Sequence, residues 1–235
     1  MLSEIFKLFW KTVERKDERR INSQTPPTEI EQFCDIQYID DGLWQHRLDV
    51  YSKSGKLSHR PVIIDIHGGG WMYGTKEINK NYCLVLAQND YVVVNINYRL
   101  APDFSVADQL RDCFFAFKWV STNIEKYGGD LNNVFVTGDS AGGFLAAYSA
   151  LLNSSEKLRK IFGVTESGLE FRACGLTSPV CFMNTHTFQD VYYSRVKGKE
   201  FSESTLRGFE NFDAVLNKGS MPPTFLVTSS GDDVG

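Results

Sequence analysis

The chain of 235 residues contains only four histidines and five cysteines, and its basic residues do not outnumber its acidic ones. A net charge of −4 provides no basic surface to neutralise phosphates, so we expect no nucleic-acid partner. The cysteines lack C-x-x-C spacing, which predicts buried free thiols and argues against a zinc site. Glu4 and Lys7 interrupt the apolar start of the chain and no small-residue cleavage site follows, so we expect neither a signal peptide nor a membrane span. These absences favour a cytoplasmic protein without stable membrane insertion, and they leave a homo-oligomer open.

What the chain does contain is an alternation of apolar, β-branched runs and helical segments. Continuous apolar runs are typical of parallel strands that are buried on both faces. The runs are residues 62–66, 92–96, 134–136, 173–176 and 225–227, and the helical segments are residues 77–88, 106–124 and 141–152. This alternation predicts the α/β class, with a mostly parallel central sheet and helices on both faces.

Three further segments complete the predicted organisation of a single domain over residues 1–235. Residues 1–25 have the apolar spacing of an amphipathic helix, which we expect to pack on the domain; a position on a membrane surface is the alternative. Residues 34–39 and 47–51 predict an antiparallel hairpin. Residues 184–219 combine aromatic and charged side chains without a strand pattern, and we expect them to form a helical cap over the site.

A G-x-S-x-G motif around Ser140 is the first chemical signal. It follows a predicted buried strand and precedes a helix-forming run, which is the context of a nucleophile elbow. Glycine at positions 138 and 142 removes side chains that would collide at the sharp turn, and so exposes Ser140. We therefore predict that Ser140 is a nucleophile and that Gly138 and Gly142 are structural; a glycine-rich turn without chemistry is the alternative.

The run His67-Gly68-Gly69-Gly70-Trp71 leaves another predicted strand and is the second signal. Glycines expose backbone N–H groups that can bind the oxyanion formed when serine attacks an ester carbonyl. We assign this oxyanion hole to the N–H groups of Gly68, Gly69 and Ala141. A phosphate site is the alternative, but no G-K-[ST] follows and the spacing is not G-x-G-x-x-G.

Several motifs together resemble the hormone-sensitive-lipase-like serine esterases. The motifs are His67-Gly-Gly-Gly-Trp71, Asn97-Tyr-Arg-Leu-Ala-Pro102, Tyr127-Gly-Gly-Asp130 and Gly138-Asp-Ser-Ala-Gly-Gly143. The resemblance implies an α/β-hydrolase fold, a Ser–His–Asp triad and hydrolysis of short to medium carboxylic esters. It also implies that His67 and Gly70 shape the oxyanion loop, and that His67 is not the triad base. Residues 98–102 are expected to hold the loop after their strand.

The resemblance further implies that the triad acid follows the strand at residues 225–227. Counting along the motif places this acid at Asp232, and a register through Asp233 is the alternative. A triad on this fold runs Ser, Asp, His along the chain, yet all four histidines precede Asp232. We therefore expect the chain to be truncated at the C-terminus, with a strand, helices and the base missing.

The sequence thus predicts a serine carboxylesterase that acts on a small-molecule ester through an acyl-enzyme and needs neither a metal nor an organic cofactor. Two alternatives remain because no histidine follows the acid. The chain could be a catalytically inactive, hydrolase-like protein that binds small molecules, or an inactive fragment.

Overall fold

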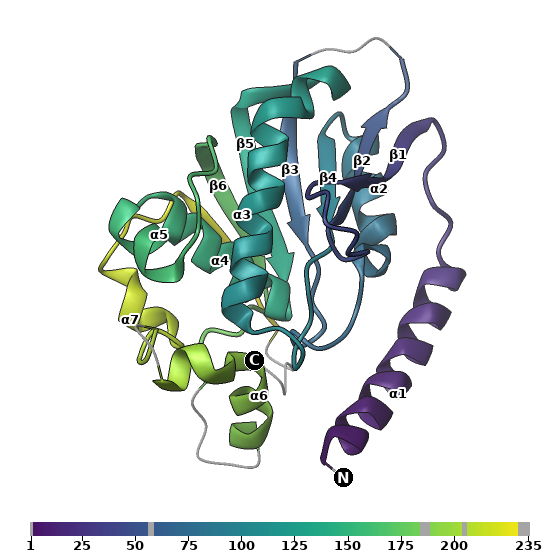
Figure 1. Cartoon of the computed structure of the whole chain (residues 1–235). Helices are drawn as coiled ribbons and strands as arrows, with labels where there is room; N and C mark the ends of the chain where they lie inside the picture. Colours follow the sequence, from purple (N-terminus) through teal and green to yellow (C-terminus); the bar gives the residue numbers. More distant parts are fainter. Residues whose placement is uncertain (1, 56–58, 184–188, 204–205, 230–235) are drawn as a thin grey trace.

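A central sheet of seven strands dominates the computed structural model, which describes residues 2–55, 59–183, 189–203 and 206–229 (Figure 1). The strand order is β1-β2-β4-β3-β5-β6-β7. The strands are β1 (Ile30–Gln37), β2 (Arg47–Lys53), β3 (Arg60–Ile66), β4 (Val92–Ile96), β5 (Gly129–Asp139), β6 (Phe171–Thr177) and β7 (Thr224–Val227). Strands β1 and β2 are antiparallel to their neighbours, and β3 to β7 are parallel to one another. The predicted mostly parallel sheet and its leading hairpin are therefore confirmed.

Helices cover both faces of this sheet. They are α1 (Leu2–Ser23), α2 (Lys80–Gln88), α3 (Val106–Asn123), α4 (Ser140–Asn153), α5 (Glu156–Phe162), α6 (Gln189–Glu203, kinked at Gly198) and α7 (Phe212–Leu216), with short 3₁₀ turns η1 (Lys76–Asn79) and η2 (Ile124–Tyr127). Helix α2 packs on one face with Tyr51 and Val93, while α3 and α4 pack on the other face with Val50 and Val94. This alternation follows from the two-residue period of strand side chains.

Local sequence explains where helix α3 begins. Ser105 accepts a hydrogen bond from the backbone N–H of Asp108, and the Asp108 carboxylate accepts one from the N–H of Ser105. This reciprocal capping box satisfies N–H groups that have no partner within the helix. Helix α3 then buries Phe114 and Phe117 completely against the sheet, so its position relative to the strands is fixed by both its cap and its core face.

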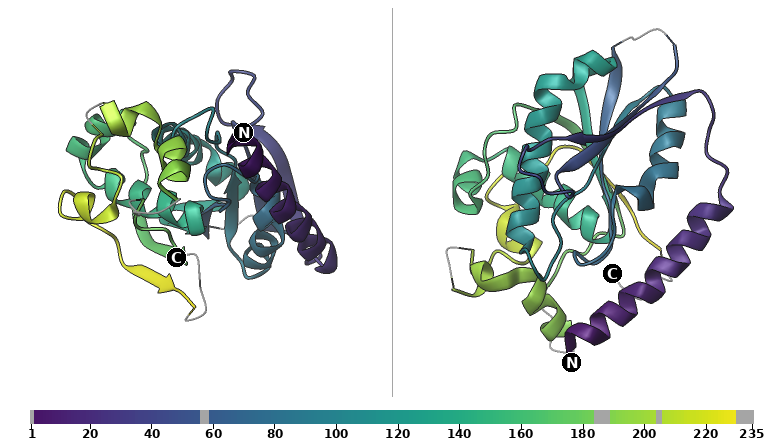
Figure 2. Two further views of the ribbon diagram at one scale, coloured as in Figure 1. Left: turned by 90° about the horizontal axis from the view of Figure 1, so that it is seen from below. Right: turned by 45° about the vertical axis from the view of Figure 1, so that its right-hand side comes forward.

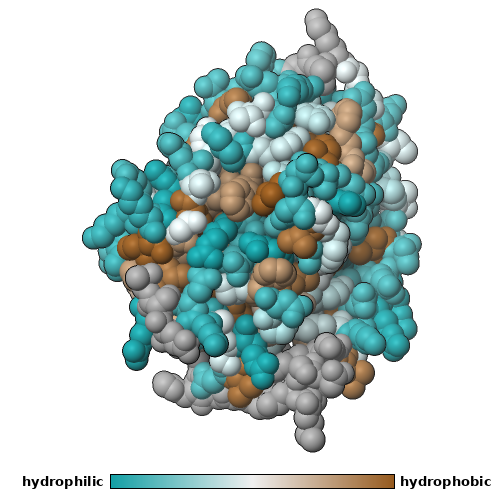
Figure 3. Space-filling view, viewed as in Figure 1, coloured by the Kyte–Doolittle hydropathy of each residue, from teal (hydrophilic) through white to brown (hydrophobic). Residues whose placement is uncertain are grey.

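The outer parts of the molecule are less enclosed. Strand β7 lies at one edge of the described sheet, and its Phe225 side chain is 73% exposed. The edge strand projects away from the helices when the molecule is viewed from below (Figure 2). On the face seen in Figure 3, hydrophobic residues form small patches among hydrophilic ones. None of the described helices is long and apolar enough to cross a bilayer.

Two segments outside the sheet approach its carboxyl end. Helix α1 begins near α6 and runs along the side of the molecule (Figure 2). Its Trp10, Val13, Asp17 and Ile21 are half-buried, at the spacing of one helical face, while most of the charged residues between them are exposed. The segment 184–219 contains α6 and α7, as its helical composition indicated, although residues 184–188 and 204–205 lie outside the described part of the chain.

Candidate active site

Ser140 stands at the junction of a strand and a helix. Strand β5 ends at Asp139, helix α4 begins at Ser140, and Ser140 has a φ of +50°. Such a left-handed conformation is strained for a residue with a side chain. It is tolerated here because the turn is sharp and packed tightly: a Cβ at Gly142 would overlap the carbonyl oxygen of Ile66, and a Cβ at Gly138 would overlap that of Gly142. The geometry is that of a nucleophile elbow.

The glycine loop, residues 67–74, leaves the neighbouring strand β3 and runs beside Ser140. Gly69 and Gly70 have φ values of +115° and +55°, which side chains rarely adopt. The carbonyl oxygen of Gly69 accepts hydrogen bonds from the N–H groups of Met72 and Tyr73 at 3.2 and 3.0 Å, so the loop folds back on itself. Its curvature directs backbone groups toward the carboxyl end of the sheet.

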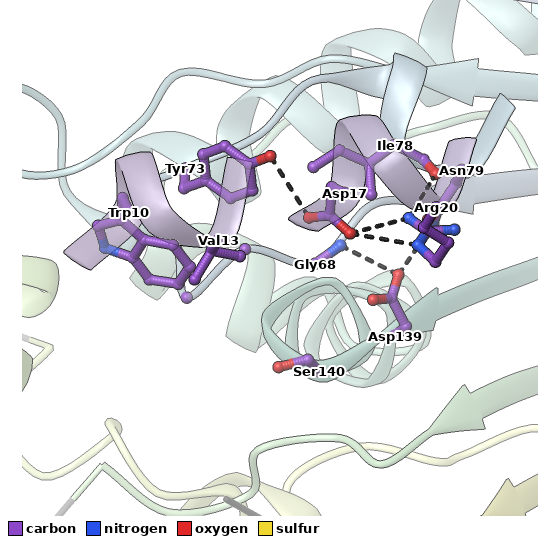
Figure 4. Close-up of a pocket in the computed structure, with 12 residues that line it drawn as sticks. Trp10, Val13, Asp17, Arg20, Gly68, Tyr73, Ile78, Asn79, Asp139 and Ser140 are labelled. Carbon is purple, nitrogen blue, oxygen red and sulfur yellow. Dashed lines mark hydrogen bonds and ion pairs between the residues drawn. The ribbon is translucent and has the colours of Figure 1, made fainter. Parts of the chain in front are cut away.

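One predicted role within this loop needs correction. The N–H of Gly68 donates a hydrogen bond to Asp139 Oδ1 at 3.0 Å and is therefore occupied (Figure 4). A backbone N–H can bind an oxyanion only if it is not already engaged, so the assignment of Gly68 to an oxyanion hole is wrong for this conformation. The N–H groups of Gly69 and Gly70 have no acceptor among the residues that the structure describes. The N–H of Ala141 lies in the first turn of α4, where helix geometry leaves it without an intrahelical acceptor.

His67 holds the glycine loop in place through contacts of its ring. Its ring is fully buried, stacks on Tyr98 at 4.4 Å and donates from Nδ1 to the carbonyl oxygen of Gly68 at 2.7 Å. Burial lowers the pKa of His67 to about 4, so the ring is neutral at physiological pH. The Tyr98 hydroxyl donates to the carbonyl oxygen of His67 at 2.7 Å, and the N–H of Ala101 donates to that of Trp71 at 2.8 Å. Residues 98–102, which the sequence predicted to hold the loop after their own strand, thus contact the glycine loop as well.

A pocket of about 400 Å³ opens beside Ser140. Its lining comes from three parts of the chain: α1, the glycine loop with the η1 turn that follows, and the β5–α4 junction (Figure 4). Trp10, Val13 and Tyr73 form an apolar end, and Trp10 stacks on Tyr73 at 5.3 Å. Asp17 and Arg20 form a charged end, joined by an ion pair of 3.1 Å. A molecule that reaches Ser140 through this pocket therefore meets both apolar and polar walls.

A group of acidic and amide side chains lies under the same junction. Asn79 Nδ2 is 2.8 Å from Asp139 Oδ1 and 3.0 Å from Asp65 Oδ2, so one amide bridges two carboxylates. Asp65 is buried on strand β3. Burial, and then the negative charge of Asp139, raise the pKa of the Asp65 carboxyl to about 7.

Sequence reasoning missed several of these residues. Asp65 carried a usable signal, because a carboxylate within the apolar run Ile63-Ile64-Asp65-Ile66 must be paired or neutral once the strand is buried. Asp139 stands inside the G-x-S-x-G motif, so its place beside Ser140 could be read from the sequence. Asn79 and the α1 residues gave no local signal, since their partners lie far away in the sequence.

Other histidines and the predicted triad acids are placed as follows. His46 is buried and held between Asp41 and Asp112, at 2.7 Å from Asp41 Oδ2 and 3.2 Å from Asp112 Oδ1. Asp232, Asp233 and His186 lie outside the described residues. The structure therefore brings together Ser140, the glycine loop and Ala141, and the position of the triad acid stays a prediction.

Comparisons with known proteins agree with this geometry. The BD-FAE family model matches residues 48–194. Isoprenylcysteine alpha-carbonyl methylesterase of Arabidopsis thaliana is 28% identical over 198 residues, which are 80% of this chain and 46% of that protein. Versiconal hemiacetal acetate esterase of Dothistroma septosporum is 36% identical over 112 residues, 47% of this chain and 33% of its own length. The chain thus spans less than half the length of these curated relatives.

Solved structures give the same picture of the fold. Esterase B from Lactobacillus rhamnosis, with a tributyrin phosphonate inhibitor, aligns with a TM-score of 0.89 and 30% identity, over 96% of this chain and 73% of that one. A bacterial heroin esterase aligns with a TM-score of 0.70 at 20% identity, over 92% of this chain and 71% of that one, and supports the fold alone. The predicted α/β-hydrolase fold is confirmed.

Proposed function

We propose that this chain, which belongs to the BD-FAE family of α/β-hydrolases, is the nucleophile-bearing part of a serine carboxylesterase that hydrolyses short to medium carboxylic esters. The observation that carries the proposal is the strained φ of Ser140 at the β5–α4 junction, beside the N–H groups of Gly69 and Gly70, which have no acceptor among the described residues. A serine in this conformation has its hydroxyl lifted out of the turn, which is what attack on a carbonyl carbon requires.

In the proposed reaction, Ser140 Oγ attacks the acyl carbon of the ester and passes its proton to a base. The negative charge that develops on the carbonyl oxygen is stabilised by the N–H groups of Gly69 and Ala141, with Gly70 taking the place predicted for Gly68. The alcohol leaves with a proton, an acyl-enzyme remains, and water then releases the acid and restores Ser140. No step uses a metal or an organic cofactor.

The base is the component that the described residues do not supply. His67 is buried, with Nδ1 committed to Gly68, and His46 is enclosed between two aspartates. The proposal therefore places the base outside the described residues, together with the triad acid at Asp232 or, in the other register, Asp233. The names of the relatives support the ester as the shared substrate class, because they are esterases of several kinds.

The test compares the wild-type protein with Ser140→Ala in hydrolysis of p-nitrophenyl butyrate and in labelling by a fluorophosphonate probe. We expect the substitution to remove labelling and to reduce kcat by about 10⁴-fold or more, with an unchanged circular dichroism spectrum. A hydrolase-like binding protein would instead bind esters without turnover or labelling in either form. Equal hydrolysis by both proteins would refute the role of Ser140.

A further inference from the structure

We propose that Asn79 and Asp65 are positioning residues for the glycine loop: the Asn79 amide holds the Asp139 carboxylate, Asp139 holds the Gly68 N–H, and Asp65 anchors Asn79 from the buried side. This inference rests on the proposed esterase function, because the loop is the part that would stabilise the oxyanion. It adds two residues to the proposed site, Asn79 from the η1 turn and Asp65 from inside strand β3.

The first step is the route from Asn79 to the loop. Asp139 Oδ1 accepts two hydrogen bonds, one from Asn79 Nδ2 at 2.8 Å and one from the Gly68 N–H at 3.0 Å. Rotation of the Asp139 side chain would release Gly68, and Asn79 opposes that rotation. Hydrogen bonds to a carboxylate are stronger than those between neutral groups, so this contact restrains the loop more than an ordinary loop contact would.

The second step is the anchor beneath Asn79. An amide NH₂ group has two hydrogens, and in Asn79 they serve two carboxylates, Asp139 and Asp65, with the latter at 3.0 Å. Asp65 is 1% exposed and lies on the sheet face that α2 covers. The Asp65 contact fixes the rotamer of Asn79 and therefore determines where its second hydrogen points.

The third step concerns what Asp65 must provide. The groups that face Asp65 are Asp139 from the end of β5 and, from α2, the Cys83 thiol and the Tyr82 hydroxyl; Cys83 is also hydrogen-bonded to Asp65. None of these groups is a cation. The Asp65 side chain accepts from the Asn79 amide, so a neutral acceptor of the same shape can also hold Asn79 in place.

The chemical consequence is a dependence of turnover on the Asn79 contact. Without it, Asp139 can rotate away from the Gly68 N–H, and the loop that carries the oxyanion donors loses its fixed position. We expect kcat to fall for this reason, because these donors act on the transition state.

The experiment uses the same chain with Asn79→Leu, Asp65→Asn and the control Asn89→Leu. Leucine matches the size of asparagine but donates no hydrogen bond. Asn89 is an exposed asparagine at the other end of α2, and its side chain bonds only to the carbonyl oxygen of Val85 among the described residues. Asp65→Asn keeps a hydrogen-bond acceptor for Asn79 and cannot ionise, so it separates position from charge. Thermal melts confirm folding of each variant.

Two readouts are taken. For p-nitrophenyl butyrate, we expect Asn79→Leu to lower kcat by about 10- to 100-fold and Asn89→Leu to leave kcat unchanged. Asp65→Asn should lower kcat less than Asn79→Leu does, because it keeps an acceptor for the Asn79 amide. Hydrogen exchange of the peptide that contains residues 67–74 should become faster in Asn79→Leu and not in Asn89→Leu.

The hydrogen-exchange measurement does not depend on turnover. It therefore distinguishes a failure of the esterase proposal from a failure of the positioning role of Asn79 and Asp65. If the wild type hydrolyses no ester but Asn79→Leu still loosens the glycine loop, the esterase proposal fails and the positioning role stands. If the wild type is active, and Asn79→Leu changes neither kcat nor loop exchange, or Asp65→Asn lowers kcat as much as Asn79→Leu does, the inference is overturned.

Discussion

The Tyr192 hydroxyl donates a hydrogen bond to the carbonyl oxygen of Gly70, which fastens helix α6 to the glycine loop. The contact spans 122 residues of sequence. It places a side chain of the predicted cap segment next to the loop that runs beside Ser140. Helix α1 reaches the same point, because a Cβ at Gly70 would meet both the Tyr192 hydroxyl and the Trp10 ring.

Replacing Tyr192 with Phe tests whether this contact matters for turnover. The variant keeps the ring but leaves the Gly70 carbonyl without its donor, which costs about 1 kcal/mol. We expect kcat/KM for p-nitrophenyl butyrate to fall by about fivefold. Tyr193→Phe is the matched control, because Tyr193 packs on Trp71 through its ring at 6.0 Å. Equal losses in the two variants would argue against a special role for the Tyr192 hydroxyl.

The turn around Ser140 predicts a strong difference between two glycine substitutions. Gly142→Ala places a methyl group against the backbone of Ile66 and His67, which cannot move without breaking the elbow. We expect it to destabilise the protein by at least about 3 kcal/mol. Gly42→Ala has open space around it and a φ of +79°, so it should cost only about 1–2 kcal/mol of backbone strain. Urea unfolding measures both values, and similar losses would contradict the tight turn.

The sequence could predict the features whose causes are local. Buried strands are continuous apolar runs, and the glycines around Ser140 stand at the spacing of a sharp turn, so both were visible in short segments. The hydrogen bond of the Gly68 N–H could not be predicted, because its acceptor Asp139 lies 71 residues further along the chain. Asn79 and Asp139 are 60 residues apart. Such pairings depend on the register of β3 against β5, which no short pattern encodes.

The two buried histidines should titrate in opposite directions. Burial lowers the pKa of His67 to about 4, whereas hydrogen bonds and charges from Asp112 and Asp41 raise the pKa of His46, although burial opposes them. We expect NMR spectra to show a neutral His67 ring throughout pH 5–8, and a His46 ring that titrates above the ordinary histidine pKa of about 6.5. A His67 ring that titrates near pH 6.5 would contradict its burial.

The same two shifts have opposite effects on stability. A lowered pKa means that the folded state resists protonation. The contribution of His67 to the free energy of unfolding is therefore full above the pKa of the unfolded state, about 6.5, and is lost as the pH falls toward 4. A raised pKa means that the folded state favours protonation. The contribution of His46 to the free energy of unfolding is therefore full below a pH of about 6.5 and is lost as the pH rises through the pKa of the folded state. The free energy of unfolding should therefore fall with pH above about 6.5 more steeply in wild type than in His46→Gln, whereas between pH 4 and 6.5 the two proteins should depend on pH alike.

Helix α1 should influence which esters reach Ser140. Trp10 forms part of the apolar end of the pocket, whereas Leu8, two residues earlier, is 69% exposed. Trp10→Ala removes a large wall and its stack on Tyr73, so we expect KM for p-nitrophenyl butyrate to rise about tenfold and the preference for butyrate over acetate to weaken. Leu8→Ala is the matched control and should leave both values unchanged. If Trp10→Ala and Leu8→Ala behave alike, α1 does not contribute to substrate selection, and the pocket between α1 and the glycine loop is not the route to the serine.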